Sequence, residues 1–85
     1  MDQQEIARRA SELPGRFATR VPPETLDGLQ LMGEGGEYGE LALELAATLA
    51  RTRATVTAAE QQDLRALLEA THMSTGPADH LAVHG

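Results

Sequence analysis

Six carboxylate side chains and no basic side chain lie in residues 22–50, which makes this segment the first candidate for a binding surface. Glu40 and Glu44 are four residues apart, so they share one side of a helix, where like charges repel each other. Glu37 lies near the start of the same helix, where the helix dipole favours a negative charge. We call four of the six the acidic ridge: Glu34, Glu37, Glu40 and Glu44.

The acidic ridge has two physical interpretations. In the first, solvent screens it, or an arginine of the N-terminal segment (Arg8, Arg9 or Arg16) lies across it, since charged runs on a surface usually serve solubility. In the second, it is a docking surface for a basic protein, because complementary potentials speed association and select partners. The second interpretation makes the four glutamates candidate partner-binding residues.

Four glycines surround the start of the ridge, at positions 33, 35, 36 and 39. A phosphate-binding loop has a Lys and a Ser or Thr beside its glycines and follows a strand. This segment offers carboxylates instead and follows a predicted helix. We therefore expect a turn between two helices, and no nucleotide cofactor.

Histidines and serines are the remaining candidates for chemistry. His80 and His84 have the four-residue spacing of two zinc ligands on a helix, but the Glu of an H-E-x-x-H site is absent. Ser11 and Ser74 lack the G-x-S-x-G pattern of an activated nucleophile. The sequence therefore predicts no catalytic residue, no metal site and no cofactor, and so no enzyme.

The composition limits the possible partners and compartment. Seven basic residues against 13 acidic ones give a net charge of −6, which argues against nucleic acid because phosphates are neutralised by cationic side chains. The absence of cysteine excludes disulfides, thiol catalysis and Cys-ligated zinc. No stretch approaches the roughly 20 apolar residues that cross a bilayer, and the first residues lack the pattern of a secretory signal. We expect a cytoplasmic protein that binds no membrane.

The elements that position these residues are predicted to be helices. Helix signals divide the chain into four segments, at about residues 2–13, 22–32, 37–51 and 57–73. Asp2 is the predicted N-cap of the first, and a continuation past Pro14 to Arg20 is left open. Thr57 and Glu60 form a predicted capping box at the start of the fourth. We predict an all-α fold, a small bundle of about four helices in one domain (residues 1–73), with a C-terminal tail (residues 74–85) that is either docked or flexible.

The third predicted helix combines the ridge with the widest apolar surface. At about 100° per residue, its apolar side chains fill an arc of roughly 200°: Tyr38, Leu41, Ala42, Leu43, Leu45, Ala46, Leu49 and Ala50. The narrow remainder holds the polar residues: Glu37, Glu40, Glu44, Thr48 and Arg51. An arc of this width is typical of a central helix that packs on more than one side.

Two motifs in residues 29–73 point to a family. One is a Gly-Glu turn followed by an Ala-Leu-Glu-Leu helix, from Gly36 to Leu45. The other is a helix that is entered as Val-Thr-Ala-Ala-Glu (residues 56–60) and contains Leu64, Leu67 and Leu68. In these motifs the chain resembles the MafI-type small bacterial immunity proteins, which occur beside polymorphic or contact-dependent toxins. The resemblance implies a non-enzymatic protein that neutralises a cognate toxin.

Two hypotheses for the function stay open. In the first, the chain is an immunity protein that binds a toxin, such as a basic nuclease domain, through the acidic ridge. In the second, it is a helical homo-oligomerisation or scaffold module, and a second copy completes the apolar arc of residues 37–51. The second has a physical reason, because so short a chain with so little bulky apolar area gains stability from a dimer.

Overall fold

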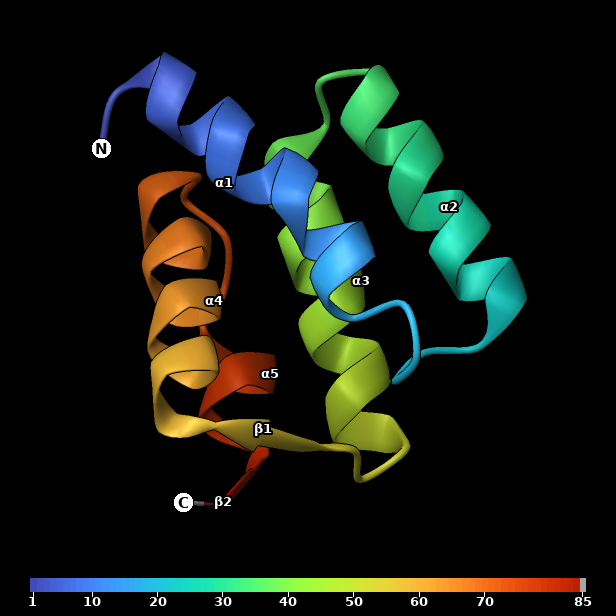
Figure 1. The fold of residues 1–85 in the computed structure, drawn as a ribbon. Helices are drawn as coiled ribbons and strands as arrows, with labels where there is room; N and C mark the ends of the chain where they lie inside the picture. The colour runs from blue at the N-terminus through green and yellow to red at the C-terminus, as the bar shows by residue number, and fades with distance from the viewer. Residues whose placement is uncertain (85) are drawn as a thin grey trace.

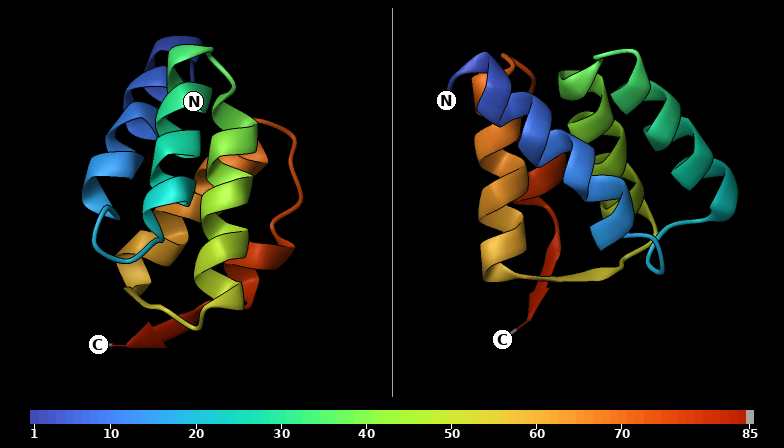
Figure 2. Two further views of the ribbon diagram at one scale, coloured as in Figure 1. Left: turned by 90° about the vertical axis from the view of Figure 1, so that its right-hand side faces the viewer. Right: turned by 45° about the horizontal axis from the view of Figure 1, so that its top comes forward.

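A computed structural model describes residues 1–84 and shows a small all-α bundle, as the sequence predicts. Within these residues, the elements in chain order are α1 (Gln3–Arg16), α2 (Pro23–Glu34), α3 (Tyr38–Arg51), β1 (Thr55–Thr57), α4 (Ala58–Ala70), α5 (Gly76–Asp79) and β2 (Ala82–His84). Figure 1 shows α1 in front of α3, with α2 on one side and α4 on the other. The two views of Figure 2 show α2 and α3 side by side as a helical hairpin.

The first helix starts where the sequence predicts and ends later. The Asp2 carboxylate caps it by accepting a backbone N–H of the first turn at 2.7 Å. The helix does continue past Pro14, which the sequence leaves open, because Pro14 lies in the last turn of α1 and the helix ends at Arg16. Pro14 is buried. The free energy gained by burying its ring offsets the loss of the one backbone hydrogen bond that a proline cannot donate. Phe17 is the buried C-cap, and the chain then turns instead of continuing as a helix to Arg20.

A turn at Gly35 and Gly36 joins α2 to α3. Gly36 has a φ of +75°, in the left-handed region that side chains rarely adopt. The Glu37 N–H donates a hydrogen bond of 2.8 Å back to the Met32 carbonyl, which closes the end of α2. The expected helix-to-helix turn is therefore confirmed, and it leaves only two residues between Glu34 and Glu37.

The central position of α3 is also confirmed. This helix packs against α1, α2, α4 and α5. Its main apolar side chains have no exposed surface: Leu41, Ala42, Leu45, Ala46 and Leu49. Leu43 and Ala50 are partly buried against the same core. A single chain thus covers most of the apolar arc that motivated the homo-oligomer hypothesis.

Thr48 differs from its predicted place on the polar side of this helix. It is fully buried. The residue lies two helical turns after the buried Leu41, on the same strip of α3. The buried side of α3 is therefore one strip wider than the apolar residues indicate.

The C-terminal residues lie against the bundle. Ala78 in α5 and Leu81 are buried members of the core. Strand β2 pairs in parallel with β1, and Val83 is opposite Val56. Parallel strands need a long crossover, which α4 and α5 supply here. Strands of three residues are too short to produce a recognisable alternation of polar and apolar residues, so the sequence did not predict them.

Candidate functional site

The acidic ridge lies on the exposed side of the α2–α3 hairpin. Glu34 is the last residue of α2, and Glu37 is the N-cap residue of α3. Glu40 and Glu44 follow on the outward side of α3, and all four residues are exposed. The structure thus brings Glu40 and Glu44 onto one side of a helix as predicted, but Glu34 belongs to the neighbouring helix. The ridge spans two helices and the turn between them.

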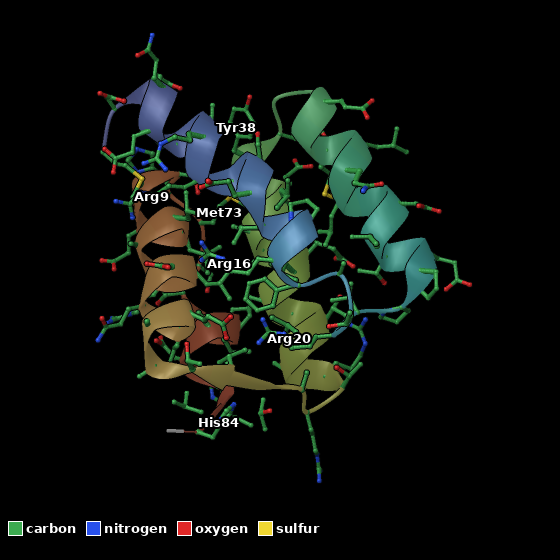
Figure 3. All side chains as sticks on the ribbon, viewed as in Figure 1. Arg9, Arg16, Arg20, Tyr38, Met73 and His84 are labelled. Atoms are coloured by element: carbon green, nitrogen blue, oxygen red, sulfur yellow. The ribbon has the colours of Figure 1, made fainter. Side chains whose placement is uncertain are left out.

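The arginines of the N-terminal segment do not screen the ridge. The ion pairs among residues 1–84 are Arg8–Glu12, Arg9–Glu5, Arg16–Asp63, Arg20–Glu60 and Arg65–Asp79. They lie along α1, join α1 or the turn after it to α4, or join α4 to α5. In Figure 3, Arg9 and Arg16 are labelled between α1 and α4, and Arg20 is labelled below the end of α1. Screening by Arg8, Arg9 or Arg16 is therefore wrong as an interpretation, because acids on α1 and α4 already engage all three.

The net charge of the chain is concentrated in residues 22–50, which are the hairpin without its last residue, Arg51. Outside residues 22–50, seven acidic residues balance the seven arginines, so the whole excess of −6 lies within residues 22–50. The six acids are all exposed, and none forms an ion pair within residues 1–84: Glu24, Asp27, Glu34, Glu37, Glu40 and Glu44. Uncompensated charges of one sign on one surface add up to a potential that attracts a cationic partner.

Glu44 is the ridge residue with a side-chain hydrogen bond within residues 1–84. Its Oε1 lies 3.5 Å from the Thr48 hydroxyl, which is also 3.5 Å from Nη2 of Arg51. Arg51 thus sits at the end of the ridge and is linked to it through one hydroxyl. The side chains of Glu34, Glu37 and Glu40 make no hydrogen bond in the part of the chain that the structure describes. The strongest uncompensated charge therefore lies around the α2–α3 turn.

An exposed leucine in the same hairpin was not found by the sequence analysis. Leu31 is 67% exposed, the largest exposed fraction among the large apolar side chains of residues 1–84. Glu24, Asp27, Leu31 and Glu34 are spaced three, four and three residues apart along α2, so they share its outer side. The signal was present in the sequence, because Leu31 falls off the stripe of Leu26, Leu29 and Met32. A leucine framed by carboxylates offers a partner an apolar contact within an acidic surface.

Two recesses of different character lie on the two sides of α1. The first, of about 240 Å³, lies between α1 and α4 and is lined by charged residues that are already paired, among them Arg8, Arg16 and Asp63. The second is an open groove of about 590 Å³ between α1 and α2. Glu34 lines this groove, so one residue of the acidic ridge borders a recess. Only the second recess leaves an acid free for a ligand.

The most strongly perturbed carboxylate is Glu60, outside the ridge. Both of its oxygens accept hydrogen bonds of 2.8 Å from the Arg20 guanidinium, and Oε1 also accepts the Thr57 N–H in the predicted capping box, which is confirmed. The Arg20 hydrogen bonds, with the Thr57 N–H in support, lower the pKa of Glu60 to about 2 against the opposing effect of burial. The Arg20 side chain also lies 4.3 Å over the Phe17 ring. This cluster holds α1 to α4, so its role is structural.

The histidine pair does not form the helical arrangement that zinc spacing would need. His80 follows the last residue of α5, and its Nδ1 lies 2.7 Å from the Gly76 carbonyl oxygen. His84 is in β2, so the two residues share no helix. Within residues 1–84, no group of three or more His, Cys, Asp or Glu side chains is placed to hold a metal ion. In the same residues, no helix is both long and apolar enough to cross a bilayer.

Comparison of the chain with protein-family models, with curated proteins and with solved structures finds no match. The features that bear on function are the charge distribution of the hairpin, the exposed leucine and the groove beside Glu34.

Proposed function

We propose that this chain is a non-enzymatic protein-binding module that neutralises a cognate bacterial toxin in the cytoplasm, as the resemblance to MafI-type immunity proteins implies. One observation supports the proposal most strongly. Residues 22–50 of the α2–α3 hairpin contain the entire net charge of the chain, and none of their six acids is used in an ion pair within residues 1–84. The partner-binding residues are those of the acidic ridge.

The partner that fits this surface is a basic protein domain. A nuclease toxin needs a cationic surface to hold the phosphates of its substrate. An acidic protein docked on that surface competes with the substrate by charge, and attraction between opposite potentials raises the association rate. Neutralisation then needs no catalytic group in the chain, only a stable contact.

Leu31 adds an apolar contact to the charged surface of the hairpin. Exposed ion pairs at the rim of an interface contribute little free energy each, because solvent screens them. Tight complexes depend more on apolar side chains that the partner covers completely. The Leu31 side chain is the apolar group of the hairpin that a partner would cover, and its neighbours Asp27 and Glu34 fix the sign of the charge around it.

Co-purification with the protein encoded by the adjacent gene tests the proposal. The ridge variant carries Glu34→Gln, Glu37→Gln, Glu40→Gln and Glu44→Gln. The control variant carries Glu5→Gln, Glu12→Gln, Glu69→Gln and Asp79→Asn, four acids outside the hairpin that are exposed except for the partly buried Glu5. Both variants change the net charge from −6 to −2. We expect the wild type and the control variant to retain the partner at low salt, and the ridge variant to lose it.

The homo-oligomer alternative is tested with the same purified chain. Light scattering that gives a monomer with a cooperative thermal transition leaves the partner-binding proposal in place. A stable dimer that fails to retain the adjacent gene product would favour the scaffold function instead.

A further inference from the structure

The groove between α1 and α2 is lined by small residues and by polar side chains. Pro14 and Gly15 of α1 and Gly33 of α2 give it a floor with little side-chain volume. Its size of about 590 Å³ lies within the roughly 300 to 1,000 Å³ of sites that take a small molecule or one large side chain. The polar lining consists of Ser11, Gln30 and Glu34.

The three polar side chains are free to bond to a ligand. None of them takes part in a side-chain hydrogen bond or an ion pair within residues 1–84. All three present acceptor oxygens: the Glu34 carboxylate, the Gln30 amide oxygen and the Ser11 hydroxyl. No basic residue lines the groove, whereas the recess on the other side of α1 is lined by arginines. A recess with acceptors, one negative charge and no cation matches a cationic ligand.

We propose that this groove receives an arginine side chain of the basic partner, with the Glu34 carboxylate accepting hydrogen bonds from its guanidinium group. The inference rests on the proposed function and specifies where the partner is anchored. Glu34 belongs both to the groove and to the acidic ridge, so an arginine held there lies next to the other ridge carboxylates across the Gly35–Gly36 turn.

The chemistry of the lining favours arginine over lysine. A guanidinium is planar, has five N–H donors and bonds to several acceptors at once, whereas an ammonium is a compact and strongly hydrated charge. The apolar stem of the arginine can lie along Pro14 and the two glycines, since long cationic side chains bury their methylene groups on apolar surface.

The glycines also provide a variant that adds a large side chain at the groove. A Cβ atom added at Gly15 meets no neighbouring atom within 4 Å, and Gly15 is exposed. Gly15→Phe therefore fills the groove from one side, and the loss of a helical glycine favours the helix. Gln62→Phe places the same side chain on an exposed position of α4, on the opposite side of α1, and serves as the matched control.

The experiment is an NMR titration of the ¹⁵N-labelled chain with Nα-acetyl-arginine methylamide. Its neutral isostere, Nα-acetyl-citrulline methylamide, is the comparison ligand. We expect a dissociation constant on the order of 1 mM for the arginine compound, with shift changes concentrated at the amides of Ser11, Gly15, Gly33 and Glu34. The citrulline compound should produce changes about fivefold smaller or less, because it lacks the charge.

The variants decide whether the groove is the site. Binding of the arginine compound should be lost in Gly15→Phe and in Glu34→Gln, and kept in Gln62→Phe. Glu34 is exposed and unbonded, so Glu34→Gln keeps the inference testable even if Gly15→Phe folds poorly. Equal responses to the two compounds, shifts spread over all the hairpin acids, or unchanged binding in Glu34→Gln would overturn the inference.

A parallel measurement with the adjacent gene product separates this inference from the proposed function. We expect Gly15→Phe to weaken that complex about tenfold and Gln62→Phe to leave it unchanged. If the ridge variant weakens the complex and Gly15→Phe does not, the groove inference fails while the proposed function stands. If neither variant has an effect, the proposed function fails.

Discussion

Arg20 and Glu60 form a two-point ion pair that joins the turn after α1 to the first turn of α4, with Nη1–Oε1 and Nη2–Oε2 distances of 2.8 Å. The pair is partly buried, with side-chain exposures of 28% and 15%. A planar guanidinium that faces a carboxylate in this way is the strongest ion-pair geometry available to a protein. This pair and Arg16–Asp63 both bind an arginine to a carboxylate of α4. That arrangement leaves the acids of the α2–α3 hairpin without cations of their own.

Glu60→Gln should destabilise the fold by about 1 to 2 kcal/mol at pH 7, which lowers the melting temperature by roughly 5 to 10 °C. Glutamine can still accept the Thr57 N–H in the capping box, so the variant removes mainly the charge that faces Arg20. Thermal denaturation followed by circular dichroism measures the change. Asp63→Asn, which removes an exposed carboxylate from the same helix, should cost less than about 0.5 kcal/mol.

The same pair predicts a pH dependence. The folded-state pKa of Glu60 is about 2, below the ordinary value of 4.5, so folding favours the ionised carboxylate. The stabilisation is fully present above about pH 5 and is lost as the pH falls through 4.5 towards 2. The difference in stability between wild type and Glu60→Gln should therefore shrink over this range. A difference that stays constant from pH 7 to pH 3 would show that the ion pair does not stabilise the fold.

Gly39→Ala should destabilise the chain although alanine is the better helix former. A Cβ at Gly39 would lie 3.0 Å from Cβ and Oγ1 of Thr71 and from Cγ of Met73. The Thr71 hydroxyl donates to the Leu67 carbonyl at 2.7 Å, so it cannot move aside without losing this bond. We expect a cost of about 1 to 3 kcal/mol, measured by urea denaturation.

Gly28→Ala is the matched control for this crowding, because an added Cβ there meets nothing within 4 Å. This change should stabilise α2 by about 0.5 to 1 kcal/mol. Equal stabilities of the two alanine variants would mean that α3 and the end of α4 are not packed as closely as the structure shows.

Leu29 and Leu31 of α2 should respond in opposite ways to replacement by alanine. Leu29 is fully buried, so Leu29→Ala should cost about 2 to 5 kcal/mol of stability. Leu31→Ala should change stability by less than about 0.5 kcal/mol, because 67% of the residue is exposed. If a partner covers Leu31, the exposed change should nevertheless weaken binding about tenfold or more. Chemical denaturation and calorimetric titration separate the two effects, and unaltered affinity would remove Leu31 from the binding surface.

Local signals in the sequence were sufficient for most of the helices. Asp2 and the Thr57–Glu60 capping box each mark the start of a helix through contacts between residues three positions apart. The structure confirms both helix starts. Gly36 likewise marks the α2–α3 turn by its own backbone preference. Each of these features depends on atoms that are close in the chain, which is why a single sequence can reveal them.

Features that depend on distant parts of the chain were not predicted. The Arg20–Glu60 pair joins residues 40 positions apart, and the β1–β2 pairing joins strands on either side of α4 and α5. Thr48 is buried by the packing around α3, which the polarity of a threonine does not predict. The groove beside Glu34 depends on how α1 and α2 are placed relative to each other. In each case the tertiary packing decides the outcome and the residue type does not.

The affinity of the ridge variant for the adjacent gene product tests the central claim most directly. Calorimetric titration at about 50 mM and 300 mM salt should give dissociation constants for the wild type, the ridge variant and the control variant. We predict that the ridge variant binds about 10- to 100-fold more weakly at low salt and loses most of the salt dependence, because its opposing charges are gone. The control variant, with the same net charge, should bind within about threefold of the wild type. Equal losses in the two variants, or an unchanged affinity of the ridge variant, would contradict the account.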